Sequence, residues 1–231
     1  MDFELYGADH MAYIYAMVFF WIALPLFSRK YLNHQSQRYI AIFLAIFIIG
    51  IEIIDDIYRV FDKSVGWNIK TDLPLHMCGF SVFATSYALL KRNQLVFELC
   101  YFWGLGGALQ AILTPDTTGF HGPFYLFTFM VSHGLIILNV FYLIFVYRMM
   151  LNRGALLRSV VITNILLVGI AIINWTLDAN YFYLFYPPDV SNPLILTDIQ
   201  PYYFLNMEIV ATIVLFLISI PMLIYRKRLE S

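Results

Sequence analysis

Leu73-Pro74-Leu75-His76-Met77-Cys78 opens an apolar run that continues from Gly79 to Thr85. This stretch places an imidazole and a thiol two residues apart at the mouth of a hydrophobic segment. A titratable side chain is costly inside a bilayer, so its presence in a membrane segment indicates a functional site by default. We therefore expect residues 73–85 to begin a membrane helix that carries the chemistry of the protein.

The composition of the chain is that of a membrane protein. Of its 231 residues, 61% are hydrophobic and 13% are charged, whereas a soluble domain is about half apolar and about a quarter charged. No polar stretch is long enough to form a separate core, which predicts a single transmembrane domain over residues 1–231. The net charge of -1 gives no indication of a nucleic-acid partner. The N-terminal residues are acidic rather than basic, so we expect no cleavable signal peptide.

Seven segments are apolar enough to cross a bilayer, which takes roughly 20 helical residues. We therefore predict an all-α, polytopic membrane protein with seven transmembrane helices. Their expected ranges are Ala12–Phe27, Ile40–Val60, Leu73–Leu90, Leu95–Thr114, Phe124–Tyr147, Leu157–Trp175 and Tyr203–Ile224.

The basic residues predict the orientation of these helices, because cytoplasmic loops carry an excess of Lys and Arg. One set of loops and flanks holds eleven of the 14 cations, and the other holds three. The eleven are Arg29, Lys30, Arg38, Lys91, Arg92, Arg148, Arg153, Arg158, Arg226, Lys227 and Arg228. The basic set is expected inside, so the N-terminus is predicted outside and the C-terminus cytoplasmic.

Cys78 and His133 are the polar residues of greatest chemical interest. Cys78 lies about six residues, or roughly 9 Å, below the expected start of the third helix, and His133 lies roughly 14 Å below the start of the fifth. In a regular helix, His76 points nearly the opposite way from Cys78. The base for the thiol is therefore either His133 or His76. Cys78 and Cys100 are expected near opposite membrane faces, which predicts two free thiols.

The second helix is predicted to carry a charged face. Asp55 and Arg59 are spaced i,i+4 in the order that favours an ion pair. Glu52 and Asp56 belong to the same face. This network is either structural or functional. In the fourth helix, Gly104, Gly106 and Gly107 favour close helix packing over phosphate binding, because no Lys follows them.

Several blocks of sequence resemble the YwaF-type bacterial integral membrane proteins and their animal relative, transmembrane protein 164. They are the His76-Met77-Cys78 triplet, the run from Gly106 through Gln110 to Thr114-Pro115-Asp116, Ser132-His133-Gly134, and Asn180-Tyr181-Phe182-Tyr183-Leu184. The resemblance covers nearly the whole chain. It implies a phospholipid acyltransferase that moves a fatty acyl chain between glycerophospholipids without acyl-CoA and uses a cysteine. Cys78 matches that cysteine, and His133 matches the histidine of the fifth helix.

This chemistry assigns expected roles to the polar residues. An imidazole that takes the Cys78 proton makes the thiol a good acyl acceptor. Asp116 or Glu208 is a candidate to orient that imidazole, and Gln110 and Asn174 are candidate oxyanion donors. Asn180 and Tyr181 are further supporting residues. The expected partners are a membrane phospholipid and a lysophospholipid, met in the outer half of the cell membrane, with no cofactor and no metal.

Two other classes of protein fit parts of the pattern. One is a seven-helix, zinc-dependent lipid hydrolase in which His76 and His133, with or without His121, hold zinc together with a carboxylate, although no tight His-x-x-x-His spacing supports it. The other is a receptor or a proton-coupled transporter that uses Glu52 and Glu208. Bound metal would indicate the hydrolase, and function that survives Cys78→Ala would indicate the transporter.

Overall fold

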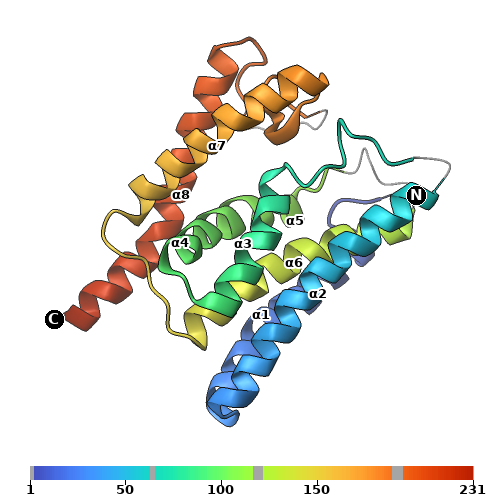
Figure 1. The fold of residues 1–231 in the computed structure, drawn as a ribbon. Helices are drawn as coiled ribbons and strands as arrows, with labels where there is room; N and C mark the ends of the chain where they lie inside the picture. Colours follow the sequence, from blue (N-terminus) through green and yellow to red (C-terminus); the bar gives the residue numbers. More distant parts are fainter. Residues whose placement is uncertain (1–2, 63–65, 117–121, 189–194, 231) are drawn as a thin grey trace.

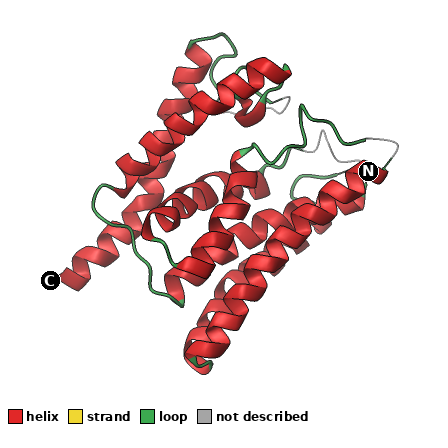
Figure 2. Cartoon of the chain, in the orientation of Figure 1, coloured by secondary structure: helices red, strands yellow, loops and turns green. Residues whose placement is uncertain are grey.

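The computed structural model describes residues 3–62, 66–116, 122–188 and 195–230. The helices are α1 (Ala8–Tyr31), α2 (His34–Phe61), α3 (Met77–Lys91), α4 (Gln94–Trp103), α5 (Leu109–Leu113), α6 (Pro123–Phe145), α7 (Ala155–Leu177) and α8 (Tyr202–Glu230). A π-helical stretch, η1 (Gly104–Ala108), joins α4 to α5, and a short 3-10 turn, η2 (Tyr181–Tyr183), follows α7. No strand occurs in these ranges (Figure 2). The prediction of an all-α fold is confirmed.

Five helices are long and apolar enough to cross a membrane: Ala8–Tyr31, Gln94–Leu113, Pro123–Phe145, Ala155–Leu177 and Tyr202–Arg226. Each corresponds to one of the predicted segments. The second segment is also one long helix, α2, but its C-terminal half is charged. The protein is therefore an all-helical, multi-pass membrane protein. Seven crossings with the N-terminus outside stay a prediction.

The third predicted helix was wrong at its start. It was expected from Leu73, but α3 begins at Met77 and has 15 residues. Pro74 disfavours helical backbone at Leu73, and His76 is extended at the N-cap, with φ -77° and ψ 160°. The first four residues of the expected helix are therefore a non-helical approach to α3.

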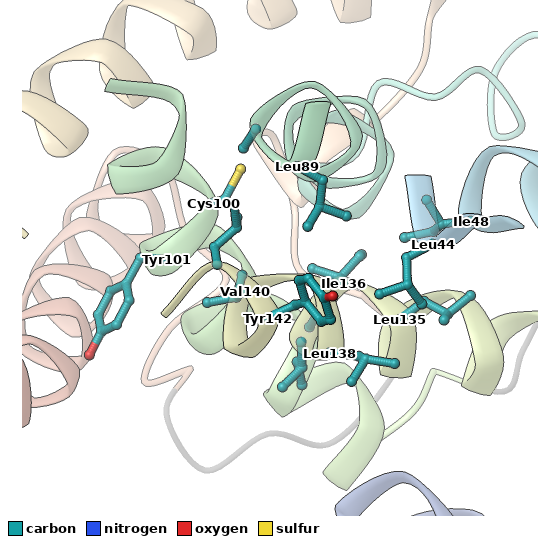
Figure 3. Packing of buried hydrophobic residues seen from close by; sticks show 14 of the residues in the cluster. Leu44, Ile48, Leu89, Cys100, Tyr101, Leu135, Ile136, Leu138, Val140 and Tyr142 are labelled. Carbon is teal, nitrogen blue, oxygen red and sulfur yellow. The ribbon is translucent and has the colours of Figure 1, made fainter. Parts of the chain in front are cut away.

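Helix α6 is the centre of the bundle. It contacts α1, α2, α3 and the α4–η1–α5 helix, whereas α7 and α8 pack on α4 and on each other at one side (Figure 1). The core lies between α2, α3, α4 and α6. Figure 3 shows Leu89, Cys100, Ile136 and Val140 within it. Along α7 and α8 many large apolar side chains are exposed, as expected for surfaces that face lipid.

The glycines of η1 let three other helices approach closely. A Cβ at Gly104 would lie 3.1 Å from Val140 of α6, one at Gly106 would lie 3.0 Å from Leu215 of α8, and one at Gly107 would lie 3.1 Å from the sulfur of Met77. These distances are tighter than ordinary Cβ contacts. The packing interpretation of this glycine-rich segment is supported.

Candidate functional site

Cys78 lies in the first turn of α3, directly after the N-cap residue His76 and Met77. The approach segment folds back over this turn. A Cβ at Gly79 would lie 2.7 Å from the carbonyl oxygen of Pro74, which leaves no room for any larger residue. Both Cys78 and His76 are half-buried.

The approach segment is held by Tyr181, which comes from the loop after α7. The buried Tyr181 hydroxyl accepts the Leu73 N–H at 3.1 Å and donates to the Ile69 carbonyl at 2.6 Å. Tyr181 is held in turn by Asn174, which is fully buried near the end of α7. The Asn174 amide is thus engaged with backbone and orders the loop that covers α3.

His76 is enclosed by aromatic rings. Its ring lies 5.2 Å from that of Tyr181 and 5.3 Å from that of Tyr183, measured between centroids. Its Nδ1 accepts the Phe182 N–H at 3.3 Å. An imidazole nitrogen that accepts an N–H carries no proton, so neutral His76 has its proton on Nε2.

Tyr183 links this group to Asp116. Its hydroxyl donates to the Asp116 carboxylate at 3.1 Å, and its carbonyl accepts the Tyr203 hydroxyl at 2.7 Å. Burial and the nearby Asp116 and Cys78 raise the pKa of Tyr183 above its ordinary value. Phe182 and Tyr183 have φ of 63° and 50°. Two adjacent bulky residues in the left-handed region are strained, and such strain concentrates at functional sites.

Helix register places Cys78 deep in the bundle. Helices α3 and α6 run in the same direction, and Asn139 of α6 donates to Thr85 of α3. Seven residues, or two turns, back along both helices bring Cys78 level with Ser132. Ser132 lies nine residues after the first residue of α6, or roughly 14 Å along its axis. Helix α3 therefore starts well below the end of the bundle.

Glu52 of α2 lies at this same level. The Ser132 hydroxyl donates a short hydrogen bond to its carboxylate. Glu52 and Cys78 are therefore both level with Ser132.

His133 is buried at the level of Cys78 on a neighbouring face of α6. It shares a face with Ile136 and Val140, both of which contact the Gly104 position of η1. Its Nδ1 donates to the Phe129 carbonyl at 2.8 Å, which leaves the Nε2 lone pair available. No hydrogen bond joins His133 to Cys78 in the described part of the chain.

The remaining predicted site residues lie in different surroundings. Gln110 is exposed on α5. Asn180 accepts the Phe185 N–H and donates to the Tyr186 carbonyl, so it shapes the loop that carries Tyr181. Glu208 accepts a hydrogen bond from Asn164 between α7 and α8, apart from Asp116. Of the two carboxylates considered for orienting an imidazole, only Asp116 is linked to one, through Tyr183, whose ring lies beside His76.

The charged face of α2 is paired. The predicted ion pair between Asp55 and Arg59 is confirmed at 2.7 Å. Asp55 also accepts the Thr128 hydroxyl at 2.5 Å, and Arg59 reaches Asp72 at 3.5 Å. The Tyr125 hydroxyl donates to Asp62 at 2.9 Å. The Thr128 and Tyr125 hydrogen bonds hold the C-terminal end of α2 against α6.

Three residues of this region were missed by sequence reasoning: Ser132, Tyr183 and Tyr203. Ser132 precedes His133, and Tyr183 is part of the Asn180–Leu184 block, so both carried a signal that was read only as family resemblance. Tyr203 lay at the expected start of the seventh helix and gave no separate signal. Its contact depends on the path of the loop that precedes α8.

Metal-ligand geometry bears on the hydrolase alternative. Among the described residues no three His, Cys, Asp or Glu side chains are grouped as ligands for one ion. His121, one of the proposed ligands, lies outside the described residues.

Cys78 and Cys100 are both free thiols, as predicted.

The fold defines an all-helical, multi-pass membrane protein in which Cys78, Ser132 and Glu52 lie at one level of the bundle. A sequence model described as the TMEM164 family matches residues 5–219, so the chain belongs to that family. An uncharacterized protein of Treponema pallidum (strain Nichols) is 26% identical over 222 residues, which are 94% of this chain and 87% of the relative. No solved structure matches.

Proposed function

We propose that this protein is an integral membrane acyltransferase that moves a fatty acyl chain between glycerophospholipids through a thioester on Cys78. The observation that carries the proposal is the position of Cys78, in the first turn of a helix that begins inside the bundle. Non-helical backbone at membrane depth is tolerated only where protein buries it or where it lines a cavity. The approach segment 73–76 is such backbone, and it places a thiol at that depth.

The two histidines suit different parts of this reaction. His133 has its Nε2 lone pair available and suits the base that takes the thiol proton. His76 carries its proton on Nε2 and suits a donor to the oxygen that becomes negative in the tetrahedral intermediate. Asp116 and Tyr183 orient the loop around His76. Glu52 is held by Ser132, which directly precedes His133. Its carboxylate stabilises the imidazolium that forms when His133 takes the thiol proton.

The reaction balances without a cofactor. The Cys78 sulfur attacks the ester carbonyl of a phospholipid, and its proton goes to the base. The carbon–oxygen bond of the ester breaks, and the leaving lysophospholipid oxygen takes that proton. The hydroxyl of a second lysophospholipid then attacks the thioester, and its proton passes through the same base to the thiolate. The proposed ester comes from the outer leaflet of the cell membrane and enters the bundle to meet Cys78, because Cys78 lies level with Ser132, roughly 14 Å along α6.

Intact mass of the purified protein after incubation with a defined phospholipid tests this proposal. We expect an added mass equal to one acyl chain, removed by hydroxylamine and absent in Cys78→Ala. The matched control is Cys100→Ala, since Cys100 is fully buried in the core away from the site. The acyl adduct should persist in that variant. No adduct on the wild-type protein, together with equal lysophospholipid production by wild type and Cys78→Ala, would contradict a covalent mechanism.

A further inference from the structure

A basic pocket opens at the end of the bundle opposite the Cys78 site. Its volume is about 230 Å³. Three cations line it, Arg38, Lys91 and Arg92, together with an aliphatic wall and the ring of Tyr147. The wall consists of Ile42, Leu89 and Leu90.

The backbone presents the cations of this pocket from two helix ends. Arg38 lies one turn before Ile42 in α2, so both face the same side. Lys91 ends α3, and Arg92 follows in the left-handed conformation, with φ 53° and ψ 35°. That turn places the Arg92 guanidinium 4.0 Å from the centroid of Tyr147. The ring contact holds the guanidinium at the pocket while leaving its N–H groups without an acidic partner.

The positive charge of the pocket is not neutralised within the described chain. Neither Arg38, Lys91 nor Arg92 forms an ion pair with any described residue, and no acidic residue lines the pocket. Arg158, another arginine at this end of the bundle, does have an acidic partner, because it is paired with the buried Glu98 at 2.7 Å. Arg38, Lys91 and Arg92 have no such acidic partner among the described residues, so their positive charge is left for a bound anion.

We propose that this pocket binds the phosphate of an anionic phospholipid in the leaflet on that side of the membrane. Basic pockets between transmembrane helices on the cytoplasmic side suit anionic headgroups, and this is the end that the Lys and Arg distribution predicts to be cytoplasmic. Arginine binds phosphate oxygens through two parallel N–H groups. Leu90 is 45% exposed beside the cations and continues the apolar surface along which an acyl chain lies. A site for a soluble anion would not require that wall.

The binding site is independent of the proposed acyl transfer. No residue that lines the pocket is among the site residues described around Cys78. Cys78 lies in the first turn of α3, and the pocket lies at its last turn. Cys78→Ala should therefore bind the anionic lipid as well as the wild type does.

Native mass spectrometry of the full chain, released from bilayers of phosphatidylcholine mixed with phosphatidylglycerol, tests the proposal. We expect phosphatidylglycerol to be retained in preference to phosphatidylcholine. Arg38→Gln and Lys91→Gln should each weaken retention about fivefold, since one cation near an anionic surface contributes about 1 kcal/mol. Lys91→Arg keeps the charge and should retain the lipid. That result would show that the fold tolerates a change at this position.

Matched controls come from the last turn of α1, where Arg29 and Lys30 are exposed at the same end but line no part of the pocket. Arg29→Gln and Lys30→Gln should leave retention unchanged. Equal loss in these controls, or equal retention of the two lipids by the wild type, would overturn a site at this pocket.

A competition assay separates a lipid headgroup from a free phosphate. Short-chain phosphatidylglycerol should displace the bound lipid, whereas inorganic phosphate at the same concentration should not. Equal displacement by inorganic phosphate would show that the pocket binds anions without regard to the acyl chain and would overturn the lipid assignment.

Discussion

Asn174 and Tyr181 are joined by two hydrogen bonds in opposite directions. The Asn174 Nδ2 donates to the Tyr181 carbonyl at 2.9 Å, and the Tyr181 N–H donates to the Asn174 Oδ1 at 2.8 Å. Through its hydroxyl, Tyr181 then holds the segment that leads to Cys78. A buried amide on α7 thereby controls the approach to the first turn of α3.

Asn174→Ala tests this control. The substitution leaves two buried backbone groups of Tyr181 without partners, which costs about 1–3 kcal/mol of stability. We expect a lower unfolding midpoint in detergent and a loss of Cys78 acylation. Thr176→Ala on the same helix is the matched control, since its hydroxyl bonds only to the Ile172 carbonyl and is exposed. Full acylation in Asn174→Ala would show that the loop is held without this pair.

Ser132→Ala removes the hydroxyl that α6 donates to Glu52. A half-buried carboxylate left without its donor should lower the free energy of unfolding by about 1–3 kcal/mol. Ser81→Ala makes the same chemical change where the hydroxyl only bonds back to the Met77 carbonyl of its own helix. Denaturation of both variants in the same detergent provides the comparison, and equal stability would contradict a structural role for the Glu52–Ser132 bond.

Arg158→Met leaves Glu98 with its charge buried and its main partner gone. Glu98 is 1% exposed and accepts two hydrogen bonds from Arg158, at 3.0 and 2.7 Å. Removing one partner of a buried pair costs about 3–5 kcal/mol, and the low end applies here because Arg158 is partly exposed. The double variant Glu98→Gln/Arg158→Met should regain most of the lost stability. A double variant as unstable as the single one would mean that Arg158 acts through packing and not through charge.

Lys70 and Asp178 form an exposed ion pair at 2.8 Å. The Lys70 ammonium holds the pKa of Asp178 below its usual value. Because the pKa is depressed in the folded state, the stabilising effect is present above the unfolded pKa of about 3.9 and is lost as the pH falls through the folded pKa. We expect Lys70→Gln to raise the Asp178 midpoint in a carboxyl NMR titration. Lys30→Gln, which is remote from Asp178, should leave it unchanged, and an unshifted midpoint in Lys70→Gln would count against the ion pair.

Much of the fold follows from local patterns. Apolar runs predicted the helical segments, i,i+4 spacing predicted the Asp55–Arg59 pair, and small residues predicted close packing at Gly104. These features depend on neighbours within a few residues or on the solvent that surrounds the chain. The candidate site was predicted less fully, because Cys78, His76 and Asp116 were recognised but Ser132, Tyr183 and Tyr203 were not.

The sequence by itself determined that this chain forms apolar helices in a membrane, because burial of backbone polar groups in lipid allows few other structures. Only the tertiary structure decided where α3 begins and which polar groups meet at its first turn. Tyr181, about a hundred residues away in the chain, holds the non-helical approach, and the register of α3 against α6 brings Cys78 level with Ser132. Those contacts depend on how helices pack against each other, and no local pattern encodes them.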